Sequence, residues 1–268
     1  MSIIQGTAKS GSASFYDFPI GDSLRFDGSS YLSRTPTTAS NRRTWTWSGW
    51  IKRNALGSTQ GIFARNDASV ASYFIWNSNN KLEFASASSG VEAQIITTPV
   101  YRDLSAWYHI MIAFDTTQGT SSNKIKFYVN GILLTAMDTS SYPSTPNYEG
   151  YINTASTHYI GNGNPGGSLG WYSAQYLANI QFIDGQALDQ YFFGEFKDNI
   201  WVPYNAFSTA GSGTATASDG DTATDSYGTN GFRLTFEDGV ESLPVSGYTG
   251  NQNAFRDKSH NTNHWKIN

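Results

Sequence analysis

The clearest alternation of apolar and polar positions lies between Trp107 and Gly131. Residues 108–114 are mostly apolar on both faces of a strand, which is typical of a strand in the interior of a sheet. Residues 124–129 then alternate Lys, Lys and Tyr with Ile, Phe and Val, as expected of a half-buried partner strand. Asn130-Gly131 is a strong hairpin signal because both residues tolerate positive φ, and an apolar run resumes directly after it. The pattern predicts three consecutive antiparallel strands.

Short runs of the same kind, separated by Gly, Asn, Asp or Pro, occur along most of the chain, at residues 23–36, 44–53, 61–65, 72–76, 81–87, 158–161 and 176–188. In residues 44–53, Trp45 and Trp47 share one face and Trp50 lies on the other. Their regular placement in a strand predicts that these tryptophans belong to the core, with a sugar-stacking platform as the alternative. His109 is expected to pack as well.

Composition favours strands over helices throughout the chain. Aromatic residues make up 15% and charged residues only 14% of the 268 residues, with 26 Gly, a balance typical of short strands joined by tight turns. The chain is long enough to bury a sizeable core. The sequence therefore predicts an all-β fold.

The distribution of small polar residues predicts four segments. Residues 1–22 are expected to form an N-terminal arm or attachment segment, with a first edge strand as the alternative. Residues 23–207 carry the strand pattern of one large domain, and residues 208–224 have the Ser, Thr, Ala and Gly composition of a flexible linker. Residues 225–268 are too few to bury a core alone, and are expected to dock as a short C-terminal β appendage.

Charge, cysteine content and hydropathy exclude several classes of protein. The formal net charge is −4 and no basic patch is present, so no nucleic-acid partner is expected. The chain contains no cysteine, which excludes disulfides, thiolate metal sites and a cysteine nucleophile. No run of 18 apolar residues and no signal-peptide pattern occurs. We therefore expect no membrane insertion and synthesis in the cytoplasm without a signal peptide.

Six segments together resemble the laminin-G-like members of the concanavalin A-like lectin/glucanase superfamily. They are SLRFDGSSYL, TWTWSGWIKR, WYHIMIAFD, KIKFYVNG, HYIGNG and YLANIQFIDGQAL, in an order and spacing that cover about residues 23–196. The resemblance implies a jelly-roll sandwich of two antiparallel sheets for the domain at residues 23–207.

A second group of segments resembles virion proteins of marine bacteriophages. It consists of FIDGQALD, Trp201-Val202-Pro203, YGTNGFRLTF and DKSHNTNHW. The resemblance implies a non-enzymatic structural protein on the virion surface, a tail-fibre or capsid-decoration subunit. Such a protein would contact other virion proteins, assemble as a homotrimer and attach to the host surface. The alternative is a carbohydrate-binding, lectin-like adhesin as the primary role, with a host-surface glycan as its partner.

A polysaccharide depolymerase is the least favoured alternative. Retaining glycoside hydrolysis needs two carboxylates about 5 to 5.5 Å apart, which the glucanase branch of the superfamily supplies as Glu-x-Asp-x-x-Glu. None of the six glutamates, Glu83, Glu92, Glu149, Glu195, Glu237 and Glu241, has this spacing, and no Gly-x-Ser-x-Gly elbow is present. We therefore predict no enzymatic activity.

The candidate glycan site is the glycine-rich loop 162–172, because sugars present apolar ring faces and polar rims to a protein. Asn162 and Asn164 offer amides, and Trp171 and Tyr172 offer aromatic faces. The alternative is that Trp171 only covers the end of the sandwich. Tyr148 belongs to a second aromatic loop with the same potential.

Calcium is the one cofactor that the superfamily resemblance implies. The matching positions are Asp27 and Asn179, where the amide in place of a carboxylate lowers the expected affinity. The alternative is that Asp27 caps a turn. His260 and His264 could share a metal only on a helix, which the residues between them disfavour, so a plain surface tail is expected there.

Overall fold

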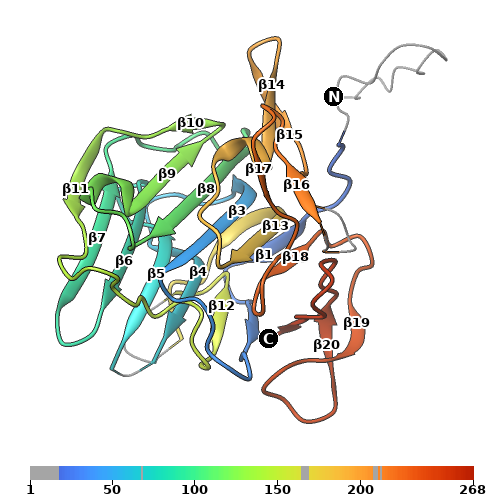
Figure 1. Ribbon diagram of the computed structural model, residues 1–268. Helices are drawn as coiled ribbons and strands as arrows, with labels where there is room; N and C mark the ends of the chain where they lie inside the picture. Colours follow the sequence, from blue (N-terminus) through green and yellow to red (C-terminus); the bar gives the residue numbers. More distant parts are fainter. Residues whose placement is uncertain (1–17, 68, 164–168, 208–210, 212) are drawn as a thin grey trace.

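Two antiparallel sheets form the centre of the protein, as the computed structural model shows (Figure 1). It describes residues 18–67, 69–163, 169–207, 211 and 213–268. The two sheets pack face to face around one aromatic core, which confirms the predicted all-β jelly-roll sandwich. Among the described residues, no helix is both long and apolar enough to span a membrane.

The first sheet, here called sheet I, has seven strands. The predicted hairpin of residues 107–131 lies in it, with β8 and β9 paired through a register in which Ile112 faces Phe127. β8 also pairs with β3, so it is an interior strand as predicted. In spatial order the strands are β1 (Leu24–Asp27), β13 (Ala174–Asp184), β3 (Thr44–Arg53), β8 (Tyr108–Asp115), β9 (Ile125–Val129) and β10 (Ile132–Leu133), with β18 (Phe232–Leu234) paired to β13.

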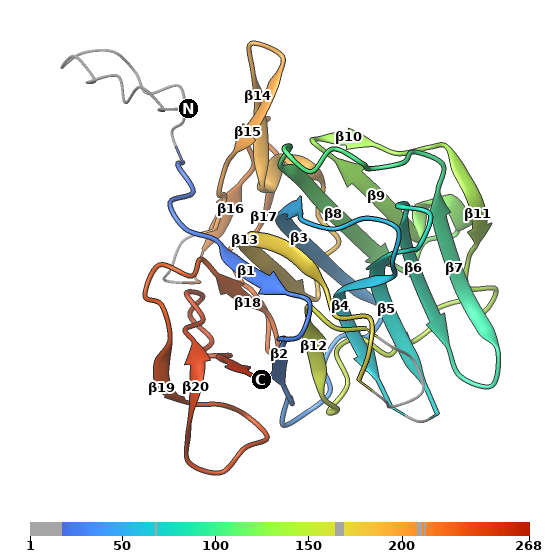
Figure 2. The same cartoon turned by 180° about the vertical axis from the view of Figure 1, so that it is seen from behind.

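The second sheet, sheet II, has ten strands. Figure 2 shows β19 and β20 at the opposite end of this sheet from β7 and β11. In spatial order the strands are β11 (Met137–Ser141), β7 (Val91–Thr97), β6 (Leu82–Ala87), β5 (Ala71–Trp76), β4 (Gln60–Asn66), β12 (His158–Ile160), β2 (Leu32–Arg34), β21 (Trp265–Ile267), β20 (Asn251–Phe255) and β19 (Glu241–Pro244).

Two separate hairpins lie beside sheet I. The first pairs β14 (Gly194–Lys197) with β15 (Ile200–Pro203) and projects away from the sandwich (Figures 1 and 2). The second pairs β16 (Thr214–Thr216) with β17 (Thr222–Thr224). Two short 3-10 helices complete the described part, η1 (Ser121–Asn123) and η2 (Gln190–Phe192).

Aromatic side chains fill the space between the sheets. Trp45 stacks on Phe114 with ring centroids 4.8 Å apart, and Trp47 meets Phe74 edge-on at 5.4 Å. The core prediction for Trp45 and Trp47 is therefore confirmed. The core prediction is wrong for Trp50. The two-residue period of the strand turns its side chain to the outer face of sheet I, where its ring contacts that of His109.

The C-terminal segment differs from the predicted appendage, because it supplies strands to both sheets. β18 pairs with β13 in sheet I, and β21 pairs with β2 in sheet II. The Trp265 ring lies in the main core, 4.8 Å from that of Phe232 and 6.3 Å from that of Phe63. Residues 225–268 thus complete the sandwich of their own chain.

The predicted linker also differs from the structure over its described residues. Residues 214–216 and 222–224 form the β16–β17 hairpin, and Ala215 and Ala217 are buried in a second cluster that covers the outer face of sheet I. Small side chains are needed there because they pack closely against Phe193, Phe207 and Tyr227. The same composition that is typical of linkers serves here for tight packing. Residues 1–17 of the predicted N-terminal arm lie outside the described residues.

Candidate functional site: a lane of tyrosines on sheet II

The loop that carries Trp171 and Tyr172 lies on the outer face of sheet II. The Gly61 N–H in β4 donates a hydrogen bond of 2.6 Å to the Trp171 carbonyl. A Cβ at Gly61 would stand 2.2 Å from the Asn162 carbonyl carbon, so the close approach of loop and strand requires a glycine. This contact positions Trp171 and Tyr172 against the strands of sheet II.

Gly61→Ala is therefore expected to displace the loop and to lower the free energy of unfolding by about 1 to 3 kcal/mol, since backbone atoms must move. Urea denaturation measures the effect. Gly90→Ala is the matched control, because a Cβ at Gly90 would meet no atom within 4 Å. Equal stability of the two variants would contradict the role of Gly61.

Strand alternation brings further aromatic residues to the same face. In β5 the side chains of Phe74 and Trp76 enter the core, so Tyr73 points outward. In β12 the side chain of Ile160 enters the core, so Tyr159 points outward. The rings form two contact groups, Trp171 against Tyr73 at 5.5 Å and Tyr31 between Tyr159 at 5.8 Å and Tyr172 at 6.0 Å.

These residues form one line across the strands. Tyr73 pairs with Ala64, Ala64 with Tyr159, Tyr159 with Ser33, and Ser33 with Lys266. Four strand spacings amount to roughly 19 Å. We call this surface the tyrosine lane and define it by Tyr31, Tyr73, Tyr159, Trp171, Tyr172 and Tyr248.

Polar groups accompany the rings at the far end of the lane. The Tyr248 hydroxyl forms a 2.7 Å hydrogen bond with Ser33 Oγ, which also accepts one of 2.6 Å from Asn268 Nδ2. Lys266 Nζ lies 4.3 Å from the centre of the Tyr248 ring. Burial and the neighbouring tyrosines raise the pKa of Tyr31, so its hydroxyl keeps its proton at neutral pH. The lane thus offers half-exposed rings together with hydroxyl, amide and ammonium groups.

One carboxylate lies at the near end of the lane. Glu83 accepts hydrogen bonds from the Tyr73 hydroxyl at 3.5 Å, Gln94 Nε2 at 3.0 Å and Asn77 Nδ2 at 3.3 Å. Its hydrogen-bond partners in the described part are a phenol and two amides.

Two of the predicted glycan-binding residues behave differently from Trp171 and Tyr172. Asn162 is fully buried, and its side-chain oxygen accepts a 3.4 Å hydrogen bond from the Gly170 N–H. Its amide therefore belongs to the interior of the loop and is not exposed to a sugar. Asn164 lies outside the described residues.

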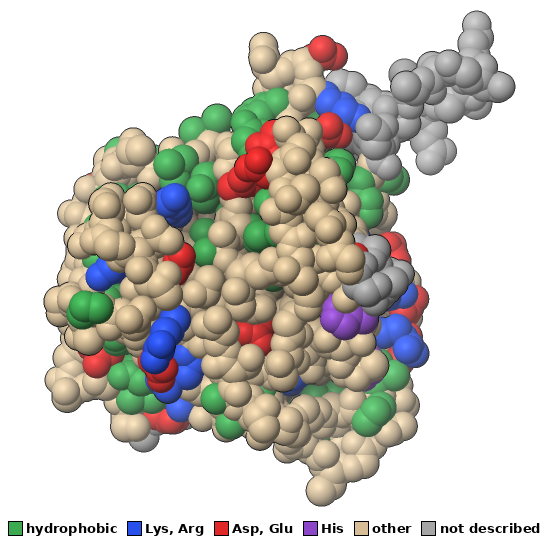
Figure 3. Space-filling model, in the orientation of Figure 1, with side chains coloured by type: hydrophobic (Ala, Val, Ile, Leu, Met, Phe, Trp, Pro, Cys, Tyr) green, Lys and Arg blue, Asp and Glu red, His purple; other side chains and the backbone are tan. Residues whose placement is uncertain are grey.

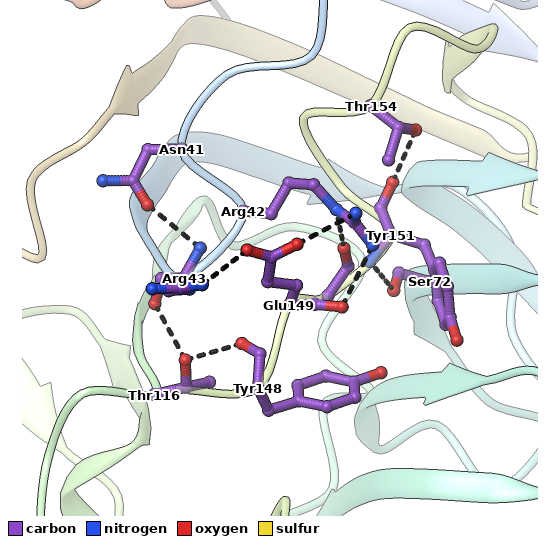
Figure 4. A network of polar contacts seen from close by, with 10 residues as sticks. Asn41, Arg42, Arg43, Ser72, Thr116, Tyr148, Glu149, Tyr151 and Thr154 are labelled. Atoms are coloured by element: carbon purple, nitrogen blue, oxygen red, sulfur yellow. Dashed lines mark hydrogen bonds and ion pairs between the residues drawn. The ribbon is translucent and has the colours of Figure 1, made fainter. Parts of the chain in front are cut away.

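Tyr148 lies apart from the lane, on the core side of sheet II. Its hydroxyl donates to Glu92 and shares a hydrogen bond with Ser86 Oγ, both at 2.7 Å. Ser86 is fully buried and follows Phe84 on the inward face of β6. Figure 4 shows that Tyr148 precedes Glu149, whose carboxylate pairs with Arg42 and Arg43. The structure thus gives Tyr148 a place in a network that closes one end of the sandwich.

The structure does not bring the two predicted calcium residues together. Oδ1 of Asp27 accepts four hydrogen bonds from Ser29 and Ser30, which hold the pKa of the carboxyl well below its usual range. This is the turn-capping alternative. Asn179 has a φ of 44° and accepts a 3.1 Å hydrogen bond from Arg233 Nε. Asp27 faces Ala174, so the two residues flank opposite ends of the β1–β13 pairing.

A different acidic group has the spacing of metal ligands. Of the described residues, only Asp189, Asp219 and Asp221 form a cluster of possible ligands, with oxygens within 4.8 Å of one another. Figure 3 shows acidic side chains over the β14–β15 and β16–β17 hairpins. Burial, then the two neighbouring carboxylates, raise the pKa of Asp189.

His264 is buried and accepts a hydrogen bond from the Asp257 N–H, so the prediction of a plain surface tail is wrong for this residue.

No direct signal in the sequence marks Tyr31, Tyr73, Tyr159 and Tyr248. Alternation does place Tyr73 and Tyr159 opposite to core residues, and this signal could have found them. The grouping depends on which strands are neighbours, and β12 lies between β4 and β2 only in the folded sheet.

Comparison with known protein families finds one match. Residues 26–181 match the concanavalin A-like lectin/glucanases superfamily. No curated protein shows significant sequence similarity to the chain.

The similar solved structures include the following three. A putative carbohydrate binding protein from Bacteroides ovatus is 12% identical with a TM-score of 0.51, over 92% of this chain and 58% of that one. A native heptameric SAP-like pentraxin from Limulus polyphemus is 20% identical with a TM-score of 0.43, over 62% of this chain and 76% of that one. Mouse laminin alpha1 domains LG4-5 are 14% identical with a TM-score of 0.47, over 68% of this chain and 47% of that one. The chain thus spans less than two thirds of the Bacteroides and laminin chains, and the Bacteroides likeness shows a shared fold.

Proposed function

The chain belongs to the concanavalin A-like lectin/glucanases superfamily, and on this basis we propose that it binds carbohydrate without cleaving it. The observation that carries the proposal is the tyrosine lane on the outer face of sheet II. Partly exposed rings provide flat apolar surfaces for sugar rings, and the polar groups beside them can pair with hydroxyls.

The shape of the lane favours an extended ligand. The rings lie in a line of roughly 19 Å across five neighbouring strands, which suits several consecutive units of a polysaccharide chain. A single sugar would cover only one of the two ring groups.

Tyr172→Ala is expected to weaken binding of such a polysaccharide by about 1 to 2 kcal/mol, a roughly five- to thirty-fold rise in Kd, because one stacking face is lost. A polysaccharide array followed by titration calorimetry measures the change. Tyr172→Phe keeps the ring and serves as the matched control. A wild-type chain that binds no polysaccharide, or a Tyr172→Ala variant with unchanged affinity, would refute the proposal. Release of reducing sugar would refute its non-enzymatic part.

We further propose that the chain acts on a virion surface, in a tail fibre or capsid decoration, and attaches the particle to host glycans. The support is the resemblance of residues 182–189, 201–203, 227–236 and 257–265 to bacteriophage virion proteins. Antibodies against the chain should label intact particles of the phage that encodes it. Light scattering tests the homotrimer that this role implies, and contacts with other virion proteins are tested by cross-linking on those particles.

Calcium near Asp27 and calcium near Asn179 stay predictions as two separate places, because the residues flank opposite ends of the β1–β13 pairing. Repeating the array with EDTA and with added calcium tests whether carbohydrate binding depends on the ion. The cluster of Asp189, Asp219 and Asp221 is the comparison site. A calcium dependence lost in Asp219→Asn would assign the ion to this cluster, and one lost in Asp27→Asn would assign it to Asp27.

A further inference from the structure

A groove of about 510 Å³ lies on the outer face of sheet I, on the opposite side of the sandwich from the tyrosine lane. Its floor is the sheet, one wall is the end of the β14–β15 hairpin, and another wall is the chain that leads into β1. Its lining consists of Pro19, Ile20, Gly21, Asp22, Ser23, Trp50, Trp107, Ala178, Trp201 and Pro203.

Three tryptophans dominate this groove. Trp50 and Ala178, from the paired strands β3 and β13, form the floor, and the Trp50 ring is backed by His109 with centroids 5.1 Å apart. Trp107 is 37% exposed and meets Tyr176 edge-on at 6.5 Å. Indole faces at two sides of a concave surface are suited to the apolar faces of sugar rings.

The third tryptophan is held rigidly. The Trp201 ring lies so close to Gly131 and Gly194 that a Cβ on either would stand 2.3 and 2.1 Å from it. Phe196 meets the ring edge-on at 4.9 Å. Because Trp201 is fixed by these neighbours, this wall of the groove exists before any ligand binds, which lowers the entropic cost of binding.

The rim of the groove carries exposed polar groups. Asp22 and Ser23 are exposed, and their side chains form no hydrogen bond or ion pair among the described residues. A carboxylate and a hydroxyl in this position can accept hydrogen bonds from sugar hydroxyls. The described lining contains the Asp22 carboxylate and no Lys or Arg, so an uncharged sugar fits it better than an anionic one.

We propose that this groove is a second saccharide-binding site, specific for short uncharged oligosaccharides. It goes beyond the proposed function because it assigns a separate site, with a ligand of different length, to the opposite face. The tyrosine lane binds along a chain, whereas the groove encloses a short fragment or a chain end. One domain then contacts two saccharides at once.

The test uses tryptophan fluorescence of the full chain with maltose, cellobiose, lactose and N,N′-diacetylchitobiose at millimolar concentration. We expect at least one of these sugars to change the fluorescence of the wild type and of Tyr172→Ala equally. Trp107→Ala should raise the Kd for that sugar by about tenfold or more, while Trp107→Phe keeps most of the affinity. Thermal unfolding of each variant checks that the fold is intact, and the exposure of Trp107 favours this.

Three results would overturn the proposal. They are no response to any of the four sugars, a response that persists in Trp107→Ala, and a response lost in Tyr172→Ala alone. A groove that takes the apolar dye anilinonaphthalene sulfonate and none of the sugars would assign it to an apolar partner instead. These readouts are separate from the polysaccharide array with Tyr172→Ala, so failure of either site is recognised independently.

Discussion

Trp265→Ala is expected to lower the free energy of unfolding by about 3 to 5 kcal/mol, the usual effect of removing a large aromatic side chain from a core. Trp265 is 1% exposed and packs against Phe63 and Phe232, one from each sheet. Its removal would leave a cavity where the two sheets meet. Urea denaturation measures the change, and the slope of the transition should stay the same because the fold is retained.

Trp107→Ala is the matched control, since that ring is 37% exposed and lies outside the core. A loss below about 1 kcal/mol for Trp265→Ala would show that the C-terminal strands contribute little to the core. A chain that ends at Ala206 extends the same test. It lacks β16 to β21, and we expect it not to fold, whereas a removable appendage would leave a folded domain.

Stability is expected to fall steeply between pH 7 and pH 5, because three histidines are buried and burial lowers the pKa of His264 as well as those of His109 and His158. Burial lowers the pKa of both His109 and His158 to about 3, and the nearby Arg34 and Arg65 disfavour a proton on His158 further. The unfolded chain takes up these protons near the ordinary histidine pKa of 6.5. The stabilisation is therefore complete above about pH 6.5 and is lost progressively as the pH falls toward 3. At pH 5 the loss is about 2 kcal/mol for each histidine.

Urea denaturation at pH 7 and at pH 5 measures this effect. His109→Gln removes one titrating group and should reduce the loss at pH 5 by about 2 kcal/mol. His260, whose ring is exposed, provides the control His260→Gln. Carboxylates such as Asp67, whose pKa is lowered to about 2, add their own loss only below about pH 4. A chain equally stable at both pH values would contradict the neutral burial of the histidines.

The sequence alone predicted the features that depend on neighbouring residues. Asn130 and Gly131 have φ values of 48° and 74°, as the hairpin signal required, and β9 and β10 pair directly across them. The two-residue period placed Trp45 and Trp47 in the core, and both are buried. His109 was expected only to pack, and the structure shows it buried with its Nε2 2.9 Å from Ser48 Oγ. Aromatic content and glycine spacing predicted the all-β class for similar local reasons.

The candidate site was predicted in part. Trp171 and Tyr172 lie partly exposed on one surface, but their partners Tyr31, Tyr73 and Tyr159 come from separate strands. Alternation shows that a side chain points to one face of a strand, and it does not show which strand lies beside it or what covers that face. For the same reason Trp50 was assigned to the core although it lines a groove.

Tertiary structure alone decided how residues 225–268 are placed. The sequence predicted a β appendage there, but residues 232–234 and 265–267 are too short to show which strands they join. They become strands because β13 and β2 offer unpaired edges, and because Phe232 and Trp265 fill the space between the sheets. Pairing energy and burial between distant segments arise only when the chain has folded, so local sequence carries little trace of them.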